Sequence, residues 1–226
     1  MSNIVLVSGT DTGIGKTWAT CALARALGAR GRRVLAVKPV ETGCEGVGNE
    51  QEDGALLAAA TGQAAPRRAL YRLRAPLAPA PALDLEERTI DFDEMVLEIE
   101  RLAADVDVLL LEGTGGLLVP LTWEWNVTDL AAALGARVLL VGADRLGTIN
   151  HMLLTLSAVE LSGLQLAGVV LSGPERPDAS TGRNAAAITR LNGISRVLTA
   201  PWTTDPATAA AALDGVAAWI DEGSPA

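Results

Sequence analysis

Short apolar runs recur along the chain, separated by longer segments of mixed or alanine-rich composition. The runs consist almost entirely of Val, Leu, Ile, Ala and Gly, and they occupy positions 4–7, 34–37, 108–111, 138–141 and 166–171. Unlike the alternating pattern of a half-exposed strand, such continuous runs are typical of strands buried on both faces of a parallel sheet. A shorter sixth strand is expected at 196–198.

Helices are expected between these strands. The segment 92–104 has apolar residues at helical spacing with charged residues between them, and Asp91 is suited to cap its first turn. Apolar or alanine-rich stretches predict further helices at 18–29, 54–60, 128–134 (capped by Thr128), 148–161, 181–191 and 206–220. By contrast, the proline-containing stretch 67–83 predicts an extended surface loop.

The alternation of strands and helices predicts an α/β fold. We expect a mostly parallel sheet flanked by helices on both faces, in one domain that spans residues 1–226. Ligands of such folds bind at the carboxyl ends of the strands. The candidate residues for chemistry are therefore those that follow a strand.

Composition and charge exclude several classes of function. With 49% hydrophobic residues the chain can bury a sizeable core. The formal net charge of −9 argues against a nucleic-acid or anionic-membrane partner, because both require a basic surface. The two cysteines, Cys21 and Cys44, provide neither a disulfide framework nor a metal quartet. No apolar run approaches the roughly 18–20 residues of a membrane span, and no signal peptide is visible, so we expect a cytoplasmic protein.

The strongest local motif is the glycine-rich segment 9–17, Gly-Thr-Asp-Thr-Gly-Ile-Gly-Lys-Thr, between the first strand and the first helix. Its glycines allow backbone N–H groups to approach phosphates, and the helix N-terminus adds partial positive charge. Lys16 would reach the β- and γ-phosphates and Thr17 would hold Mg²⁺. Five residues separate Gly9 from Gly15, where the usual motif has four. A tight strand-to-helix turn explains the glycines but not the Lys and Thr, so we predict a P-loop nucleotide-hydrolase architecture.

Other polar residues follow later strands and are expected near this loop. Lys38 follows the second strand and could neutralise charge on a transferring phosphoryl group. Glu112 follows the third strand, at a place suited to a Mg²⁺ carboxylate, and Asp144 follows the fourth. Asp53 is either a further carboxylate ligand or a helix cap. The glycine-rich segment 113–116 is either an anion-binding nest or a flexible connection.

Taken together, these segments resemble the dethiobiotin synthetase family, the ATP-dependent ligases of biotin synthesis. The resemblance covers nearly the whole chain in order, through residues 9–17, 38–43, 52–56, 112–117, 147–151 and 201–202. Each segment alone is weak evidence, but the combination is specific. The family's phosphate loop also has the five-residue spacing noted above.

The resemblance implies a reaction. The substrates would be 7,8-diaminononanoate, CO₂ (or bicarbonate) and ATP or another nucleoside triphosphate, with Mg²⁺ as cofactor. One amine would take up CO₂ as a carbamate, whose oxygen would attack the γ-phosphate to give a carbamic–phosphoric anhydride. The second amine would close the ureido ring and expel phosphate. Two lysines and Mg²⁺ would offset the repulsion between a carbamate anion and a triphosphate.

The resemblance also implies roles for individual residues. Lys16 and Lys38 would stabilise the transferring phosphoryl group with help from Thr12, and Thr42 would contact the diamine or its carbamate. The implied Mg²⁺ ligands are Thr17, Asp53 and Glu112. The implied nucleotide-binding residues are Gly13, Ile14, Gly15, Lys16, Thr17, Trp18, Asp53, Glu112, Gly113, Thr114, Gly115, Ser172, Gly173, Pro201, Trp202 and Thr203. The family is dimeric, and the segment around Asn150 would complete the pocket of the neighbouring subunit.

The chain departs from the family pattern at two places. Many members have Ala-Pro-His in the substrate loop, whereas this chain has Ala78-Pro79-Ala80. Members that prefer adenine place an Asn after the fifth strand, whereas this chain has Ser172-Gly173. The second departure suggests the hypothesis of weak discrimination between nucleotide bases.

Three alternatives explain part of the pattern. A partitioning-type switch ATPase that acts on a protein partner would carry an extra lysine in the phosphate loop, where this chain has Asp11. A cobyrinate-type amide ligase would carry a glutaminase domain with a nucleophilic cysteine, but both cysteines lie in the first fifth of the chain. A nucleotide-binding module without activity leaves Lys38, Asp53 and Glu112 without a shared purpose. We therefore favour the ligase.

Overall fold

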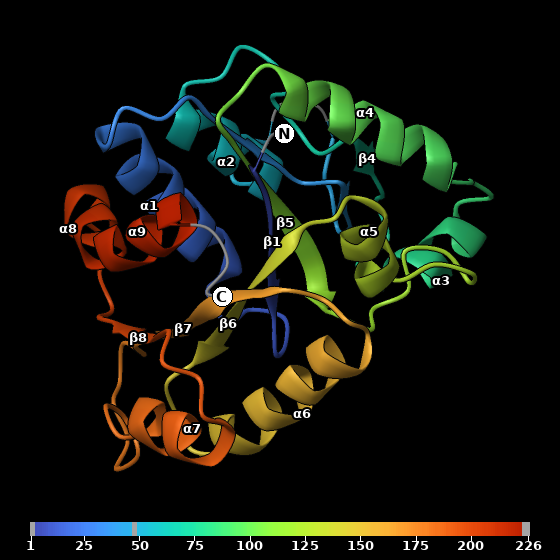
Figure 1. The fold of residues 1–226 in the computed structure, drawn as a ribbon. Helices are drawn as coiled ribbons and strands as arrows, with labels where there is room; N and C mark the ends of the chain where they lie inside the picture. The colour runs from blue at the N-terminus through green and yellow to red at the C-terminus, as the bar shows by residue number, and fades with distance from the viewer. Residues whose placement is uncertain (1–2, 47–48, 223–226) are drawn as a thin grey trace.

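The centre of the molecule is a six-stranded sheet in which every neighbouring pair is parallel (Figure 1). The computed structural model describes residues 3–46 and 49–222. The strand order is β2-β5-β1-β6-β7-β8. The strands are β1 (Asn3–Gly9), β2 (Val34–Val37), β5 (Val108–Gly116), β6 (Arg137–Ala143), β7 (Leu166–Ser172) and β8 (Val197–Ala200). The predicted parallel sheet is thus confirmed, and the sixth strand begins one residue later than expected.

Helices cover both faces of this sheet (Figure 1). On one face lie α1 (Lys16–Ala29), α2 (Asp53–Thr61), α8 (Pro206–Ala212) and α9 (Asp214–Glu222). On the other lie α4 (Phe92–Ala104), α5 (Val127–Ala133), α6 (Thr148–Leu161) and α7 (Asn184–Asn192). Successive side chains of β1 point to opposite faces, so Val5 packs with the first group and Leu6 with the second. Because both sides are buried, the strands have no polar alternation.

The stretch 67–83 is not the extended surface loop that its prolines predict. It contains β4 (Tyr71–Arg72), which pairs in parallel with β3 (Val40–Glu41), and it runs into helix α3 (Pro79–Leu85). The first helical residue is Pro79. Proline is tolerated there because the N–H of a first helical residue has no partner within the helix. Ala82 and Leu83 are buried, so tertiary packing stabilises this short helix.

Several helix boundaries differ from the expected ones by one to three residues, and one expected helix is two helices. Asn126, not Thr128, caps α5, because its side chain accepts from the backbone N–H of Asp129 while the Asp129 carboxylate accepts from that of Asn126. Helix α7 begins at Asn184 instead of residue 181. The segment 206–220 forms two helices, α8 and α9, which meet at the fully buried Leu213, where φ of −100° and ψ of 8° depart from the α-helical values.

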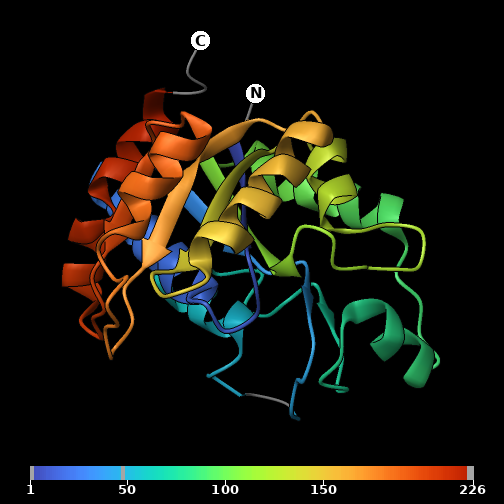
Figure 2. The ribbon, with the colours of Figure 1, turned by 90° about the horizontal axis from the view of Figure 1, so that it is seen from below.

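The carboxyl ends of the strands form one edge of the molecule, and the loops that follow β1, β2 and β7 meet there (Figure 2). The chain from β2 through β3, α2 and β4 folds over this edge beside the loop between β1 and α1. The order of the strands reverses next to β1, which is the position where open α/β sheets bind ligands. Among the described residues, no helix combines the length and apolarity that crossing a membrane requires.

Candidate active site

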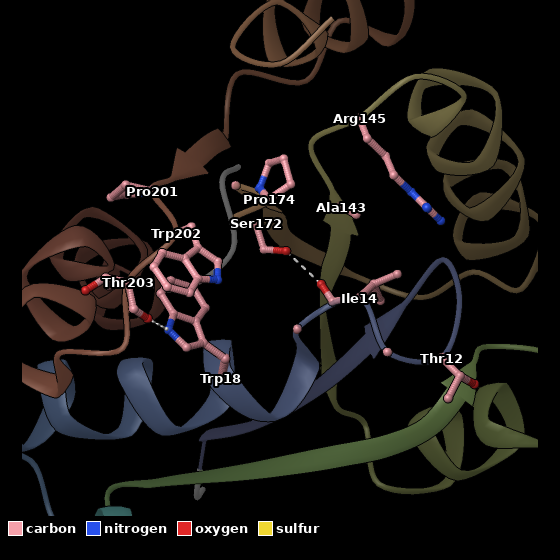
Figure 3. Close-up of a pocket in the computed structure, with 13 residues that line it drawn as sticks. Thr12, Ile14, Trp18, Ala143, Arg145, Ser172, Pro174, Pro201, Trp202 and Thr203 are labelled. Atoms are coloured by element: carbon pink, nitrogen blue, oxygen red, sulfur yellow. Dashed lines mark hydrogen bonds between the residues drawn. The ribbon is translucent and has the colours of Figure 1, made fainter. Parts of the chain in front are cut away.

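The loop between β1 and α1 is held in shape by its own backbone and by β7. The Lys16 Nζ donates to the Asp11 carbonyl at 2.7 Å, so the lysine arches over its loop. The Ser172 Oγ donates to the Ile14 carbonyl at 2.7 Å (Figure 3). Gly15 has φ of 95°, and a Cβ there would lie 3.0 Å from that same Ser172 oxygen. Glycine is therefore required at this position, both for its backbone conformation and for space.

Next to the loop, one lysine, two carboxylates and one hydroxyl meet between the end of β2, the middle of β5 and the first turns of α1 and α2. The Lys38 Nζ lies 2.7 Å from Asp53 Oδ2 and 2.7 Å from Glu112 Oε1. The Thr17 Oγ1 lies 2.8 Å from Asp53 Oδ1 and 2.8 Å from Glu112 Oε1. Lys38 and Glu112 are buried, with 3% and 0% of their surface exposed. The structure thus brings together four residues that are up to 95 positions apart in the chain.

The charged groups of this cluster shift one another's pKa values. Burial opposes the charged form of Lys38, but Glu112 and Asp53 outweigh it and raise the pKa of Lys38. Burial alone would raise the pKa of Asp53, but Lys38 and the Thr17 hydrogen bond lower it overall. For Lys16, burial and then repulsion from Lys38 lower the pKa. The two carboxylates thus hold Lys38, the Asp11 carbonyl holds Lys16, and a bound anion would relieve the repulsion between the two lysines.

The residues of this cluster fit a Mg²⁺ ion. The Glu112 Oε2 is buried and has no hydrogen-bond partner among the described residues. A buried carboxylate oxygen without a partner is unfavourable unless a cation or a donor satisfies it. With the Thr17 hydroxyl and the Asp53 carboxylate, Glu112 offers the oxygen ligands that Mg²⁺ prefers.

A pocket of about 670 Å³ opens from this cluster and is here called the phosphate pocket. It is lined by Thr12, Gly13, Gly15, Lys16, Thr17, Trp18, Lys38, Glu41, Thr42, Asp53, Pro76, Leu77, Ala78, Glu112, Thr114, Gly115 and Val119. β5 continues through Gly116, but its pairing with β1 is irregular beyond Glu112, and Gly115 has a φ of 66°. The anion-binding role expected for 113–116 stays a prediction. Thr114 and Gly115 still line the pocket, whereas Gly113 packs against Val127.

A second pocket, of about 560 Å³, lies on the other side of Gly13–Gly15 and is here called the outer pocket (Figure 3). Its lining residues are Thr12, Gly13, Ile14, Gly15, Trp18, Ala143, Arg145, Ser172, Gly173, Pro174, Pro201, Trp202 and Thr203. The Trp18 Nε1 donates to the Thr203 carbonyl at 3.1 Å, which ties α1 to the segment after β8. In Figure 3 both indole rings lie on one side of the pocket and Arg145 on the other.

Asp144 and Asn150 lie outside both pockets, although Asn150 is expected only in the pocket of the neighbouring subunit. Asp144 does follow β6, but it is fully buried and accepts hydrogen bonds from the Gly182 N–H and the Asn184 side chain. It therefore fixes the start of α7 and lines neither of the two pockets, which corrects its assignment to the crevice. Asn150 is exposed on α6 and contacts neither pocket of its own chain. In the proline segment, Ala78 lines the phosphate pocket while Ala80 is buried in α3.

Glu41 is a buried carboxylate at the site that the sequence pattern does not single out. It lines the phosphate pocket and accepts hydrogen bonds from the backbone N–H groups of Asp53 and Gly54. The available signal was its position directly after a strand-like segment and close to Lys38. That signal does not predict the hydrogen-bond partners of Glu41, because the path of the irregular loop between Glu41 and α2 cannot be derived from the local sequence.

The chain is similar to known proteins over nearly its whole length. A family model described as an AAA domain matches residues 3–209. The ATP-dependent dethiobiotin synthetase of Anaeromyxobacter dehalogenans strain 2CP-C is 44% identical over 218 residues, which are 95% of this chain and 96% of that protein. The ATP-dependent dethiobiotin synthetase of Aquifex aeolicus strain VF5 is 40% identical over 190 residues, 84% of this chain and 85% of that protein.

Solved structures show the same fold at low sequence identity. The cell division ATPase MinD from Pyrococcus furiosus matches with a TM-score of 0.63 and 21% identity, over 98% of this chain and 99% of that one. A ParA family ATPase from Chlorobium tepidum matches with a TM-score of 0.58 and 14% identity, over 97% of each chain. These matches confirm the P-loop architecture and carry no information about the reaction.

Proposed function

Because this chain belongs to the ATP-dependent dethiobiotin synthetase family, we propose that it forms the ureido ring of dethiobiotin from 7,8-diaminononanoate, CO₂ and a nucleoside triphosphate. Sequence identity above 40% over 95% of the chain assigns it to these ATP-dependent ligases. The switch ATPases share only the fold with this chain. The observation that carries the proposal is the buried cluster of Lys38, Asp53 and Glu112 beside the lysine of the phosphate loop.

We propose that the reaction begins with a carbamate on one amine of the substrate. The carbamate oxygen attacks the γ-phosphate, the bond to the leaving nucleoside diphosphate breaks, and a carbamic–phosphoric anhydride forms. The second amine then attacks the carbonyl carbon, a proton leaves that amine, and phosphate departs as the ring closes. Both anionic reactants must approach each other in a pocket that contains only a few cations, so local positive charge decides the rate.

Lys16 and Lys38 supply that charge. Lys16 would exchange its contact with the Asp11 carbonyl for the phosphates, while Lys38 remains anchored by two carboxylates at 2.7 Å. The exchange is favourable because burial and Lys38 destabilise the charged form of Lys16 until an anion binds. Thr12, which lies between the phosphate and outer pockets, would assist at the transferring group.

Thr17, Asp53 and Glu112 would hold Mg²⁺. The Glu112 Oε2, which has no partner in the described part of the chain, supports this assignment. The ion would supply charge neutralisation on the triphosphate. Thr42 lines the phosphate pocket on the side of Pro76, Leu77 and Ala78, which suits contact with the diamine or its carbamate.

The outer pocket would take the nucleoside. Trp18, Pro201, Trp202 and Thr203 offer flat apolar surface for a base, and the Ser172 hydroxyl hydrogen is already directed to the Ile14 carbonyl. We therefore expect weak discrimination between bases, because stacking tolerates any base. The ratio of kcat/KM values for ATP, CTP and GTP measures this, and a large preference for ATP would contradict it.

We further propose a cytoplasmic homodimer in which Asn150 completes the pocket of the neighbouring subunit. Its exposed position on α6 is compatible with that role.

The deciding experiment measures phosphate release from Mg·ATP with and without 7,8-diaminononanoate and bicarbonate, followed by mass spectrometry of the organic product. We expect release only when both are present, and a product heavier than the diamine by CO₂ less water. Release that is indifferent to both compounds would instead favour a switch ATPase.

A further inference from the structure

Glu41 lies on β3 with its carboxylate against the first turn of α2. Its Oε1 accepts from the Asp53 N–H at 2.5 Å and its Oε2 from the Gly54 N–H at 3.0 Å. The first N–H groups of a helix have no partner inside the helix. Glu52, the residue at the capping position, makes no side-chain cap. A carboxylate from a different strand therefore caps α2.

Glu41 also belongs to a group of possible metal ligands, because its carboxylate lies within 4.8 Å of the Cys44 thiol and the Glu52 carboxylate. Protein donors already occupy these carboxylates. Arg72 donates to both oxygens of Glu52, at 2.9 Å and 2.5 Å, and each oxygen of Glu41 takes a backbone N–H. The donors on these four oxygens explain the group as one that holds the backbone and Arg72 in place.

The segment on which Glu41 lies is itself fixed. Glu41 pairs with Arg72 in the β3–β4 ladder, and its carbonyl accepts from the Leu73 N–H at 2.8 Å. Gly54 packs so tightly on the next segment that a Cβ there would lie 2.3 Å from the Ala69 nitrogen. The first turn of α2 is thus held between the Glu41 carboxylate and the backbone at 68–69.

On the opposite side of this turn, the Asp53 side chain reaches Thr17 Oγ1 at 2.8 Å and Lys38 Nζ at 2.7 Å. We propose that Glu41 is a positioning residue that fixes the main chain of Asp53 and thereby aims its carboxylate at the Mg²⁺ site. This inference rests on the proposed function of Asp53 as a ligand of that ion. Residues that orient metal ligands in this way affect metal affinity although they do not contact the ion.

The test replaces Glu41 by Gln, which keeps the size of the side chain but turns one acceptor oxygen into an N–H donor that faces a backbone N–H. We expect the dissociation constant of Mn²⁺ in the presence of ADP, measured by electron paramagnetic resonance, to rise by about 10- to 100-fold. The Mg²⁺ concentration for half-maximal activity should rise by a similar factor, the KM for the diamine should change little, and high Mg²⁺ should restore kcat. Glu45→Gln, in an exposed carboxylate of the same loop, is the matched control and should leave all values unchanged.

The Asp53→Asn variant distinguishes failure of the metal-binding role of Asp53 from failure of the positioning role of Glu41. If Asp53→Asn leaves Mn²⁺ affinity unchanged, the metal-binding role of Asp53 is wrong. If Asp53→Asn weakens Mn²⁺ binding and Glu41→Gln does not, the positioning role is wrong and the proposed function stands. If the Glu41 variant fails to fold, hydrogen exchange of the wild-type protein tests the inference instead. The Asp53 and Gly54 amides should exchange slowly with deuterium, and rapid exchange of both overturns the inference.

Discussion

Replacing Lys38 by Met tests whether this buried lysine serves both the fold and the reaction. The Nζ is the donor shared by Asp53 and Glu112, at 2.7 Å from each, and the residue is 3% exposed. Methionine fills nearly the same volume without the charge. The substitution therefore removes the ion pairs while leaving the packing largely intact.

The effect on stability follows from the buried Glu112 carboxylate, which loses its cationic partner. Glu112 is fully buried. Among the described residues its Oε2 has no hydrogen-bond partner, and without Lys38 its Oε1 would keep only the contact with Thr17. Removing one partner of a buried ion pair costs about 3–5 kcal/mol. Because the pKa of Lys38 is raised above its ordinary value of 10.5, this difference from wild type is fully present below that pH and declines as the pH rises through the folded-state pKa.

The effect on the reaction is a separate quantity. Loss of one preorganised charge at a developing anion lowers kcat by about 10²–10³-fold. Phosphate release that depends on the diamine, measured at saturating Mg·ATP, gives kcat, and urea unfolding without nucleotide gives the stability.

Arg33→Met is the matched control, because Arg33 precedes β2 as Lys38 follows it, and it pairs with Asp107 at the surface. Both its stability and its kcat should stay near the wild-type values. A Lys38→Met variant with wild-type stability and a kcat lowered less than tenfold would refute the reasoning.

Three further results are expected. Gly54→Ala should destabilise the protein by about 1–3 kcal/mol in urea unfolding, because the new Cβ meets the Ala69 backbone, which cannot move aside; unchanged stability would contradict that packing. The pKa of Asp53 is lowered overall because Lys38 outweighs burial, so this contact stabilises the protein above pH 3.8 and is lost as the pH falls through the folded-state pKa; Asp53→Asn should therefore flatten the acid side of the stability profile. Burial raises the pKa of Cys21 to about 12, so its alkylation by iodoacetamide at pH 8 should be much slower than that of a free thiol, and an equal rate would show that the thiol is not shielded.

The sequence alone determined the architecture and the centre of the site. Continuous apolar runs identify strands that are buried on both faces, because a strand with one solvated face must alternate polar and apolar residues. The phosphate loop is encoded by neighbouring residues whose conformation and charge act locally. Lys38 and Glu112 could be assigned to one edge, because parallel strands deliver their carboxyl ends to the same place.

Predictions from the local sequence were wrong where tertiary packing determines which of several possible conformations a segment adopts. The prolines before Leu85 favour a loop, yet Pro79 starts α3 because Ala82 and Leu83 gain a buried position there. Asp144 follows a strand as the other site residues do, but its partners Gly182 and Asn184 turn it into the core.

Only the tertiary structure decided which distant groups meet. Lys38 contacts Glu112, which lies 74 positions later, and Trp18 contacts Thr203, which lies 185 positions later. Glu41, on β3, caps helix α2, which begins 12 positions later. None of these pairs has a local signature, because a hydrogen bond between distant residues depends on the path of the backbone between them. The sequence therefore determines which chemical groups are available at the strand ends, and the packing of the sheet, β3 and α2 determines which of them act together.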